Sequence, residues 1–135
     1  MRIVLISCVA KKLPARAMAK DMYISPLFKY AYKYAKKIQA DKIFILSAKY
    51  GLLAENEIID PYNEALNTKP QNEIKIWAEN VITALSEHTD LQNDEFVFLA
   101  GDTYRRYLEC KVKKPCLPLL GLRIGEQLAF YKRNT

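Results

Sequence analysis

Residues 2–12 read RIVLISCVAKK, an apolar run followed by small, polar and cationic residues. The four consecutive apolar side chains from Ile3 to Ile6 predict a strand that is buried on both faces, because a half-exposed strand would alternate. Residues 42–52, KIFILSAKYGL, repeat the pattern, since this second apolar run also ends in a serine that is followed by a lysine. Ligands of parallel α/β sheets bind in the crevice beyond the carboxyl ends of the strands. The two strand ends are therefore expected to form one binding site.

Strand and helix patterns alternate along the whole chain. The expected strands cover residues 2–7, 42–47 and 95–99, with a weaker one over 117–120 that Pro118 places at a sheet edge. Of the expected helices, the first begins after Ser25 as N-cap, the second has Pro70 in its first turn, the third begins after Asp102 as N-cap, and the last begins near Arg123. This order predicts a single α/β domain over residues 1–135, a three-layer α/β/α sandwich with a mainly parallel four-stranded sheet.

Composition narrows the class of protein. The chain has 135 residues, half of them apolar, which suits one domain with its own core. No apolar run approaches the roughly 20 residues of a membrane span, and the first residues lack the features of a secretory signal. Three cysteines form no recognisable disulfide framework. We therefore expect a cytoplasmic protein with free thiols and no membrane partner.

Charge is distributed unevenly along the sequence. The first 50 residues hold 11 Lys and Arg against 2 Asp and Glu, whereas residues 51–100 hold 2 against 10. Within the basic part, Lys29, Lys33, Lys36 and Lys37 recur at helical spacing, so they share one helix face. Such a face is a candidate nucleic-acid-binding surface, and the alternative is an ordinary solvated face.

Side chains at the expected strand ends suit an anionic ligand. Lys11, Lys12 and Lys49 supply full positive charge there, and the tight turn at Gly101 supplies backbone N–H groups. Neither a P-loop nor a G-x-G-x-x-G fingerprint occurs, so the usual ATP and dinucleotide sites are not expected. The ring faces of Tyr23, Tyr50 and Tyr62 are candidates for stacking on a nucleobase.

Cys8 and Asp60 are the candidate reactive groups. Cys8 follows the first strand near two lysines, an environment that favours a thiolate, but the single histidine, His88, is expected at the opposite edge of the sheet. No zinc spacing is present, so we expect no metal and no cofactor, and Cys8 is expected to line the pocket. Asp60 is the candidate general base, and the alternative is that it caps the turn at Pro61.

Five stretches together carry a resemblance to a known family. They are residues 7–13, 22–28, 46–53, 60–62 and 121–126, and they span nearly the whole chain. They resemble an uncharacterised family of small bacterial, archaeal and phage domains, which looks similar to the peroxide-stress protein YaaA and to the core of archaeosine synthase.

The resemblance implies a uracil-DNA-glycosylase-like fold and a link to DNA binding or to modification of a deazaguanine base in transfer RNA. It also implies which residues line the pocket: Ser7, Cys8, Lys11, Tyr23, Ser25, Ser47, Lys49, Gly51 and Asp60. We therefore expect an enzyme that acts on a nucleobase, nucleotide or modified base. The alternatives are a non-catalytic DNA- or RNA-binding module and a sensor of a nucleotide derivative, and the oligomeric state is left open.

Overall fold

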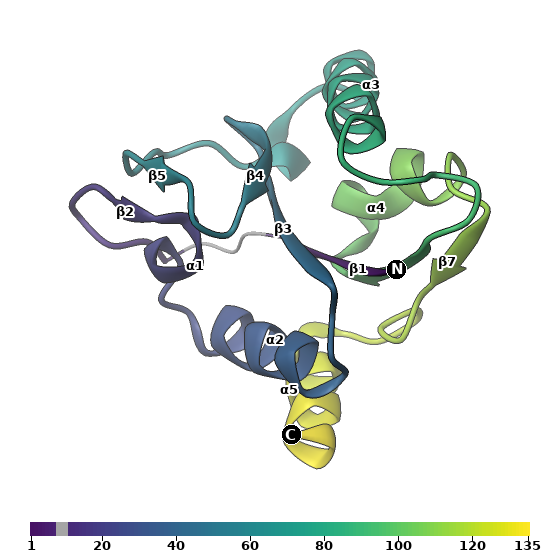
Figure 1. Cartoon of the computed structure of the whole chain (residues 1–135). Helices are drawn as coiled ribbons and strands as arrows, with labels where there is room; N and C mark the ends of the chain where they lie inside the picture. Colours follow the sequence, from purple (N-terminus) through teal and green to yellow (C-terminus); the bar gives the residue numbers. More distant parts are fainter. Residues whose placement is uncertain (8–10) are drawn as a thin grey trace.

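The computed structural model describes residues 1–7 and 11–135, and a five-stranded sheet forms its centre (Figure 1). The strands lie in the order β4-β3-β1-β6-β7. Their bounds are β1 Arg2–Ser7, β3 Lys42–Ser47, β4 Gly51–Ala54, β6 Glu95–Leu99 and β7 Lys114–Cys116. All neighbours run parallel except β3 and β4, which are antiparallel. The mainly parallel α/β sheet is confirmed, but the expectation of four strands is wrong.

β1 is central because both of its edges are paired in parallel register. Leu5 lies opposite Phe44 of β3 on one side and Phe98 of β6 on the other. Val4 and Leu5 are completely buried, as the unbroken apolar run predicts. The same register brings Ser7, the last residue of β1, next to the end of β3. Sheet pairing thus sets the carboxyl ends of these strands side by side.

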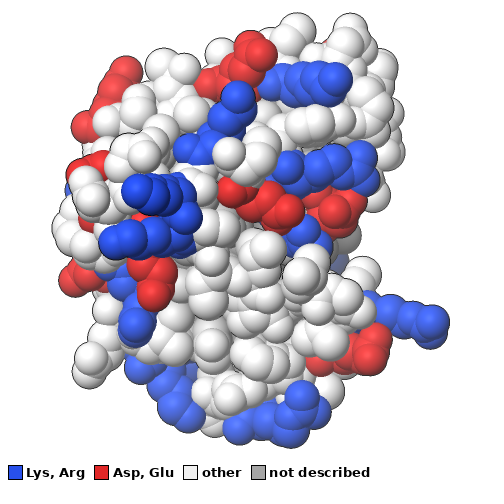
Figure 2. All heavy atoms as spheres, turned by 90° about the vertical axis from the view of Figure 1, so that its right-hand side faces the viewer, with Lys and Arg blue, Asp and Glu red and all other residues white. Residues whose placement is uncertain are grey.

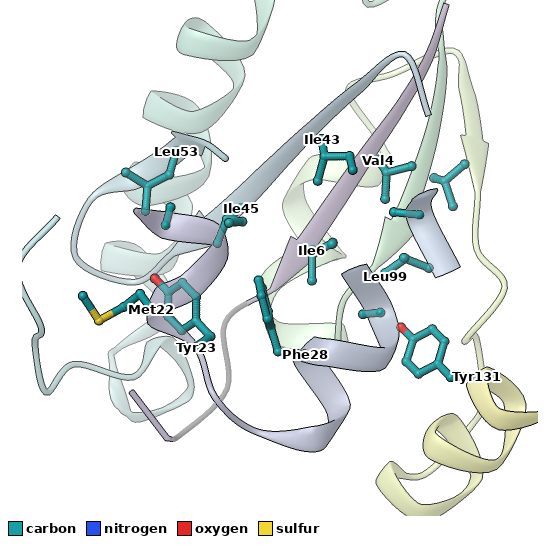
Figure 3. Packing of buried hydrophobic residues seen from close by; sticks show 14 of the residues in the cluster. Val4, Ile6, Met22, Tyr23, Phe28, Ile43, Ile45, Leu53, Leu99 and Tyr131 are labelled. Carbon is teal, nitrogen blue, oxygen red and sulfur yellow. The ribbon is translucent and has the colours of Figure 1, made fainter. Parts of the chain in front are cut away.

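Two helices cover each face of the sheet, which gives three layers (Figure 1). α2 (Pro26–Lys37) and α5 (Ile124–Asn134) pack on one face, and α3 (Gln71–Ser86) and α4 (Asp102–Glu109) on the other. Alternate residues of each strand enter the two cores, so that Val4 faces α2 and Leu5 faces α3. Figure 3 shows the first core, in which Phe28 of α2 and Tyr131 of α5 lie under the sheet.

The helix starts follow from local sequence. The Ser25 hydroxyl accepts a hydrogen bond from the Phe28 N–H at 3.3 Å, and Pro26 occupies the first turn, so the predicted N-cap of α2 is confirmed. Arg123 caps α5, with its backbone N–H bonded to the Glu126 carboxylate at 3.0 Å. The cap of α4 is Gly101, not Asp102, which is the first helical residue.

Two strand predictions are corrected by the structure. No strand covers residues 117–120, because residues 118–121 form a turn, and the last parallel strand is β7, which ends just before them. β4 was missed because it follows β3 after a turn of only three residues, where the sequence suggests a functional loop. Gly51 makes this turn possible, since its φ of +75° lies in the left-handed region.

A small second sheet lies beside the main one. β2 (Ala17–Met18) pairs with β5 (Ile58–Ile59), and α1 (Ala19–Met22) follows β2. β5 and a short 3-10 helix, η1 (Leu66–Thr68), both lie in the connection between β4 and α3. Within the described part of the chain, none of the helices has the length and apolar content needed to cross a bilayer.

Replacement of Gly51 with alanine tests the turn between β3 and β4. An added Cβ would meet only Val81 Cγ2, at an ordinary 3.9 Å, so the cost is that of the backbone conformation alone. We expect Gly51→Ala to lower the free energy of unfolding by about 1–2 kcal/mol in urea titrations. Gly125→Ala is the matched control, because Gly125 lies in α5 with no atom within 4 Å of an added Cβ, and it should not destabilise the domain. Equal stability of the two variants would contradict this account.

Candidate functional site

A cavity of about 340 Å³ opens beyond the carboxyl ends of β1 and β6. Its lining includes Ser7 at the end of β1 and Gly101 just after β6. The first turns of α2, α4 and α5 also contribute to the lining, through Leu27, Thr103 and Ile124 respectively. This is the edge at which the sequence predicts a site, and a volume in this range holds a small organic molecule.

Three helices begin at this cavity. α2, α4 and α5 have 12, 8 and 11 residues, and each contributes residues of its first turn to the lining. The first N–H groups of a helix have no partner within the helix, and the helix dipole is positive at this end. Three such ends around one cavity favour a negatively charged ligand group.

Two polar side chains of the lining, those of Asn67 and Gln127, are not predicted from the sequence. Asn67 lies in the connection before α3, and Gln127 lies in the first turns of α5. The Gln127 amide nitrogen donates to the Leu122 carbonyl at 3.1 Å, which fixes its orientation. Neither residue belongs to a recognisable motif, so only the fold could reveal them. Amides of this kind can read the hydrogen-bonding edge of a base.

Asp102 places a carboxylate in the same lining. Arg106 donates to it through Nε at 3.1 Å and through an Nη2 atom, and Arg105 Nη1 lies 3.7 Å from the other carboxylate oxygen. These arginines are three and four residues later on α4, so the helix itself supplies the countercharge. Two arginines therefore offset the negative charge of Asp102 beside a cavity that otherwise suits anions.

A chain of three hydroxyls lies at the end of β3. Ser47 is completely buried, and its Oγ accepts hydrogen bonds from the backbone N–H groups of Lys49 (3.2 Å) and Tyr50 (3.0 Å). The same hydroxyl donates to the Tyr62 hydroxyl at 2.9 Å, which lies 2.7 Å from the Tyr23 hydroxyl. Ser47 thus holds the strand-end turn and anchors two of the predicted tyrosines.

Aromatic rings and lysines surround this hydroxyl chain. Lys12 Nζ lies 4.5 Å from the centre of the Tyr62 ring, and the Tyr50 ring meets Tyr62 edge-on at 5.5 Å. Tyr23 is only 1% exposed and packs on Phe28, so it cannot stack on a base as expected. Tyr50 is 36% exposed, and its ring is the more accessible stacking surface.

Trp77 of α3 connects the hydroxyl chain to the cavity. Its indole N–H donates to the Ser47 carbonyl at 2.8 Å, and its ring meets that of Tyr104 edge-on at 5.7 Å. Tyr104 lines the cavity and accepts a hydrogen bond from the Leu66 N–H at 3.3 Å. The ends of β1, β3 and β6 therefore belong to one packed unit.

Asp60 lies in an exposed ion pair. Arg16 Nε lies 3.0 Å from the Asp60 carboxylate. The Asp60 backbone carbonyl accepts a hydrogen bond from the Tyr50 hydroxyl at 3.3 Å. The hydrogen bond and positive charge of Arg16 lower the pKa of Asp60 below its usual value. A lowered pKa makes a carboxylate a weaker base, so the role predicted for Asp60 gains no support from its surroundings.

The other predicted residues occupy separate positions. Lys11 and Lys49 are exposed, and Lys29, Lys33, Lys36 and Lys37 form an exposed row on α2. His88 follows α3 and its carbonyl accepts from Lys42 Nζ at 2.7 Å, at the start of β3, so its expected place at the opposite edge is confirmed.

Cys8 lies outside the described residues. Within the described residues, no group of three or more His, Cys, Asp or Glu is placed to hold a metal ion.

A family model matches residues 3–133, so the chain belongs to a family of unknown function, DUF6884. No curated protein and no solved structure matches it.

Removal of the Ser47 hydroxyl tests its role in the strand-end turn. Ser47→Ala leaves the part-buried N–H groups of Lys49 and Tyr50 without their acceptor, so we expect a loss of about 1–3 kcal/mol in the free energy of unfolding, measured by urea denaturation. Ser86→Ala is the control, because the exposed Ser86 hydroxyl donates only to the Thr83 carbonyl. A similar loss in both variants would exclude a special role for Ser47.

The ion pair of Asp60 predicts a change in its titration. Arg16→Gln removes the hydrogen bond and charge that lower the pKa of Asp60, so this pKa should rise toward its ordinary value. Carboxyl NMR signals followed between about pH 2 and pH 7 measure the change. Arg2→Gln, which removes the partner of Glu95, should leave Asp60 unchanged. Because the pKa is lowered in the folded state, the pair stabilises the fold at neutral pH and this contribution disappears as the pH falls through that pKa.

Proposed function

We propose that this domain, whose family has no assigned activity, binds a nucleotide or a nucleobase in the cavity at the carboxyl edge of its sheet and acts on the base. The observation that carries the proposal is the meeting of three helix starts with amide, hydroxyl and carboxylate side chains around one cavity of about 340 Å³. A nucleotide combines an anionic phosphate with a base whose edge is recognised by hydrogen bonds. Both parts thus find complementary groups in this lining.

Different parts of the lining would bind the phosphate and the base of the nucleotide. The first turns of α2, α4 and α5 would hold the phosphate, and Asn67 and Gln127 would bond to the base edge. Asp102 and Asp60 are the carboxylates that could accept a proton or orient water. Asp102 lines the cavity itself, so it is the first residue to test for chemistry.

The sequence resemblance supports the same class of ligand. The motif stretches of this chain resemble those of the peroxide-stress protein YaaA and of the archaeosine synthase core, relatives linked to DNA binding and to a modified base in transfer RNA. The resemblance also suggests a uracil-DNA-glycosylase-like arrangement of the domain. Function resides in the site, however, so the reaction is not inferred from the fold.

Thermal unfolding in the presence of ligands tests the proposal. Nucleoside monophosphates, nucleosides, free bases and deazaguanine bases would be compared, and a ligand at 100 times its Kd should stabilise the fold by about 2.7 kcal/mol. We expect the phosphate-bearing ligands to stabilise most, because the helix starts favour an anion. No stabilisation by any of these compounds would refute the assignment of the cavity.

Gly101→Leu is the variant that fills the cavity. Gly101 lines it, has a φ of −71°, and leaves open space around an added Cβ, so a leucine can be accommodated without backbone strain. We expect this variant to fold and to lose the ligand-induced shift, whereas Gly125→Leu, at a glycine outside the lining with equal space, should retain it. Product analysis with the unmodified protein separates an enzyme from a sensor, since only an enzyme forms product. The same analysis with Asp102→Asn then tests whether Asp102 takes part in the reaction.

A further inference from the structure

The charged surface of α2 extends well beyond the cavity. Lys29, Lys33, Lys36 and Lys37 are exposed, and α2 contains no acidic residue. At a rise of about 1.5 Å per residue, the row from Lys29 to Lys37 extends about 12 Å along the helix. A free nucleotide in the cavity has no group that reaches along this row.

α5 adds a further cation to this row. Lys132 Nζ lies 6.0 Å from the centre of the Tyr30 ring of α2, and Tyr30 is next to Lys29 in sequence. We call these five lysines, Lys29, Lys33, Lys36, Lys37 and Lys132, the lysine surface. In Figure 2 several Lys or Arg side chains lie along the lowest edge, an acidic side chain lies just above them at the lower right, and both signs of charge are mixed higher up.

The ion pairs of the lysine surface are few. Lys36 Nζ lies 3.6 Å from the Glu55 carboxylate, which also accepts from the Tyr32 hydroxyl at 2.6 Å. Among the described residues, no ion pair is found for Lys29, Lys33, Lys37 or Lys132. Lys36 is therefore the least available of the five for a partner. The other four can bind an anion without breaking an ion pair.

The position of the row links it to the cavity. Lys29 and Leu27, which lines the cavity, both lie near the start of α2, so the row begins at the cavity end of the helix, although on a different side of it. A chain with a negative charge at every repeat could therefore continue from the cavity along α2. The aromatic rings of Tyr30 and Tyr32 flank the row, as stacking rings accompany cations in proteins that bind single strands.

We infer that the lysine surface binds the phosphate backbone of a single-stranded polynucleotide, whose base enters the cavity. This inference rests on the proposed function and names its substrate as a polymer instead of a free nucleotide. A single strand is the partner that fits, because its bases are free to leave the strand without breaking pairs.

Binding of a fluorescent 12-nucleotide strand, measured by anisotropy at several salt concentrations, tests the inference. In the triple variant Lys29→Gln, Lys33→Gln and Lys37→Gln, the salt slope should fall by about 2, and affinity at 0.1 M salt should fall roughly tenfold to hundredfold. The control removes three exposed lysines on the side of α3 and α4: Lys75→Gln, Lys111→Gln and Lys113→Gln. It changes the net charge equally and should bind nearly as the unmodified protein does.

The outcomes separate this inference from the proposed function. Equal losses in the two triple variants, no salt-dependent binding by the unmodified protein, or tighter binding of a duplex of equal length would each overturn it. Stabilisation by free nucleotides should persist in the lysine variant, because the cavity is intact. If that stabilisation is present while the strand does not bind, the inference fails and the proposed function stands; if it is absent from the unmodified protein, the proposed function itself fails.

Discussion

The parallel pairing of β1 with both β3 and β6 is the constraint on which the other features depend. It buries β1 on both faces, which requires two helical layers and explains why its apolar run is unbroken. It also brings three strand ends to one edge, so the connections that follow β1 and β6 start from that edge. The helices α2, α4 and α5 consequently begin where the cavity lies. The site is thus a result of the topology as much as of its side chains.

The Ser47 hydroxyl stabilises the turn that follows β3. A strand that turns back sharply into an antiparallel neighbour leaves N–H groups of the turn without a partner in the sheet, and Ser47 Oγ accepts hydrogen bonds from two of them. Its remaining hydrogen bond holds Tyr62, and through Tyr62 the hydroxyl of Tyr23. A serine at this strand end therefore has a structural function before it has any role toward a ligand. The similar position of Ser7 differs in this respect, since Ser7 is in the cavity lining.

The sequence predicts the elements with strong periodicity and misses those defined by geometry. β1, β3 and β6 have the predicted bounds, and Ser25 caps α2 as predicted, because burial and capping act locally. β4 depends on the positive φ of Gly51 and on pairing with β3, neither of which has a periodic pattern. For the site, the edge was predictable from topology, whereas Asn67 and Gln127 come from segments without a motif.

Charge explains why a carboxylate can belong to a site that favours anions. Helix starts attract negative groups, and Asp102 occupies the first position of α4, where it is itself stabilised by that dipole. Arg105 and Arg106 then offset its charge from the next turn, so the field of the other helix starts is not cancelled by Asp102. Asp60 is held by a single exposed arginine in an open loop, where solvent screens the pair. The two side chains are about equally exposed, but only Asp102 lies in the cavity lining, so it is the carboxylate that a bound ligand would meet.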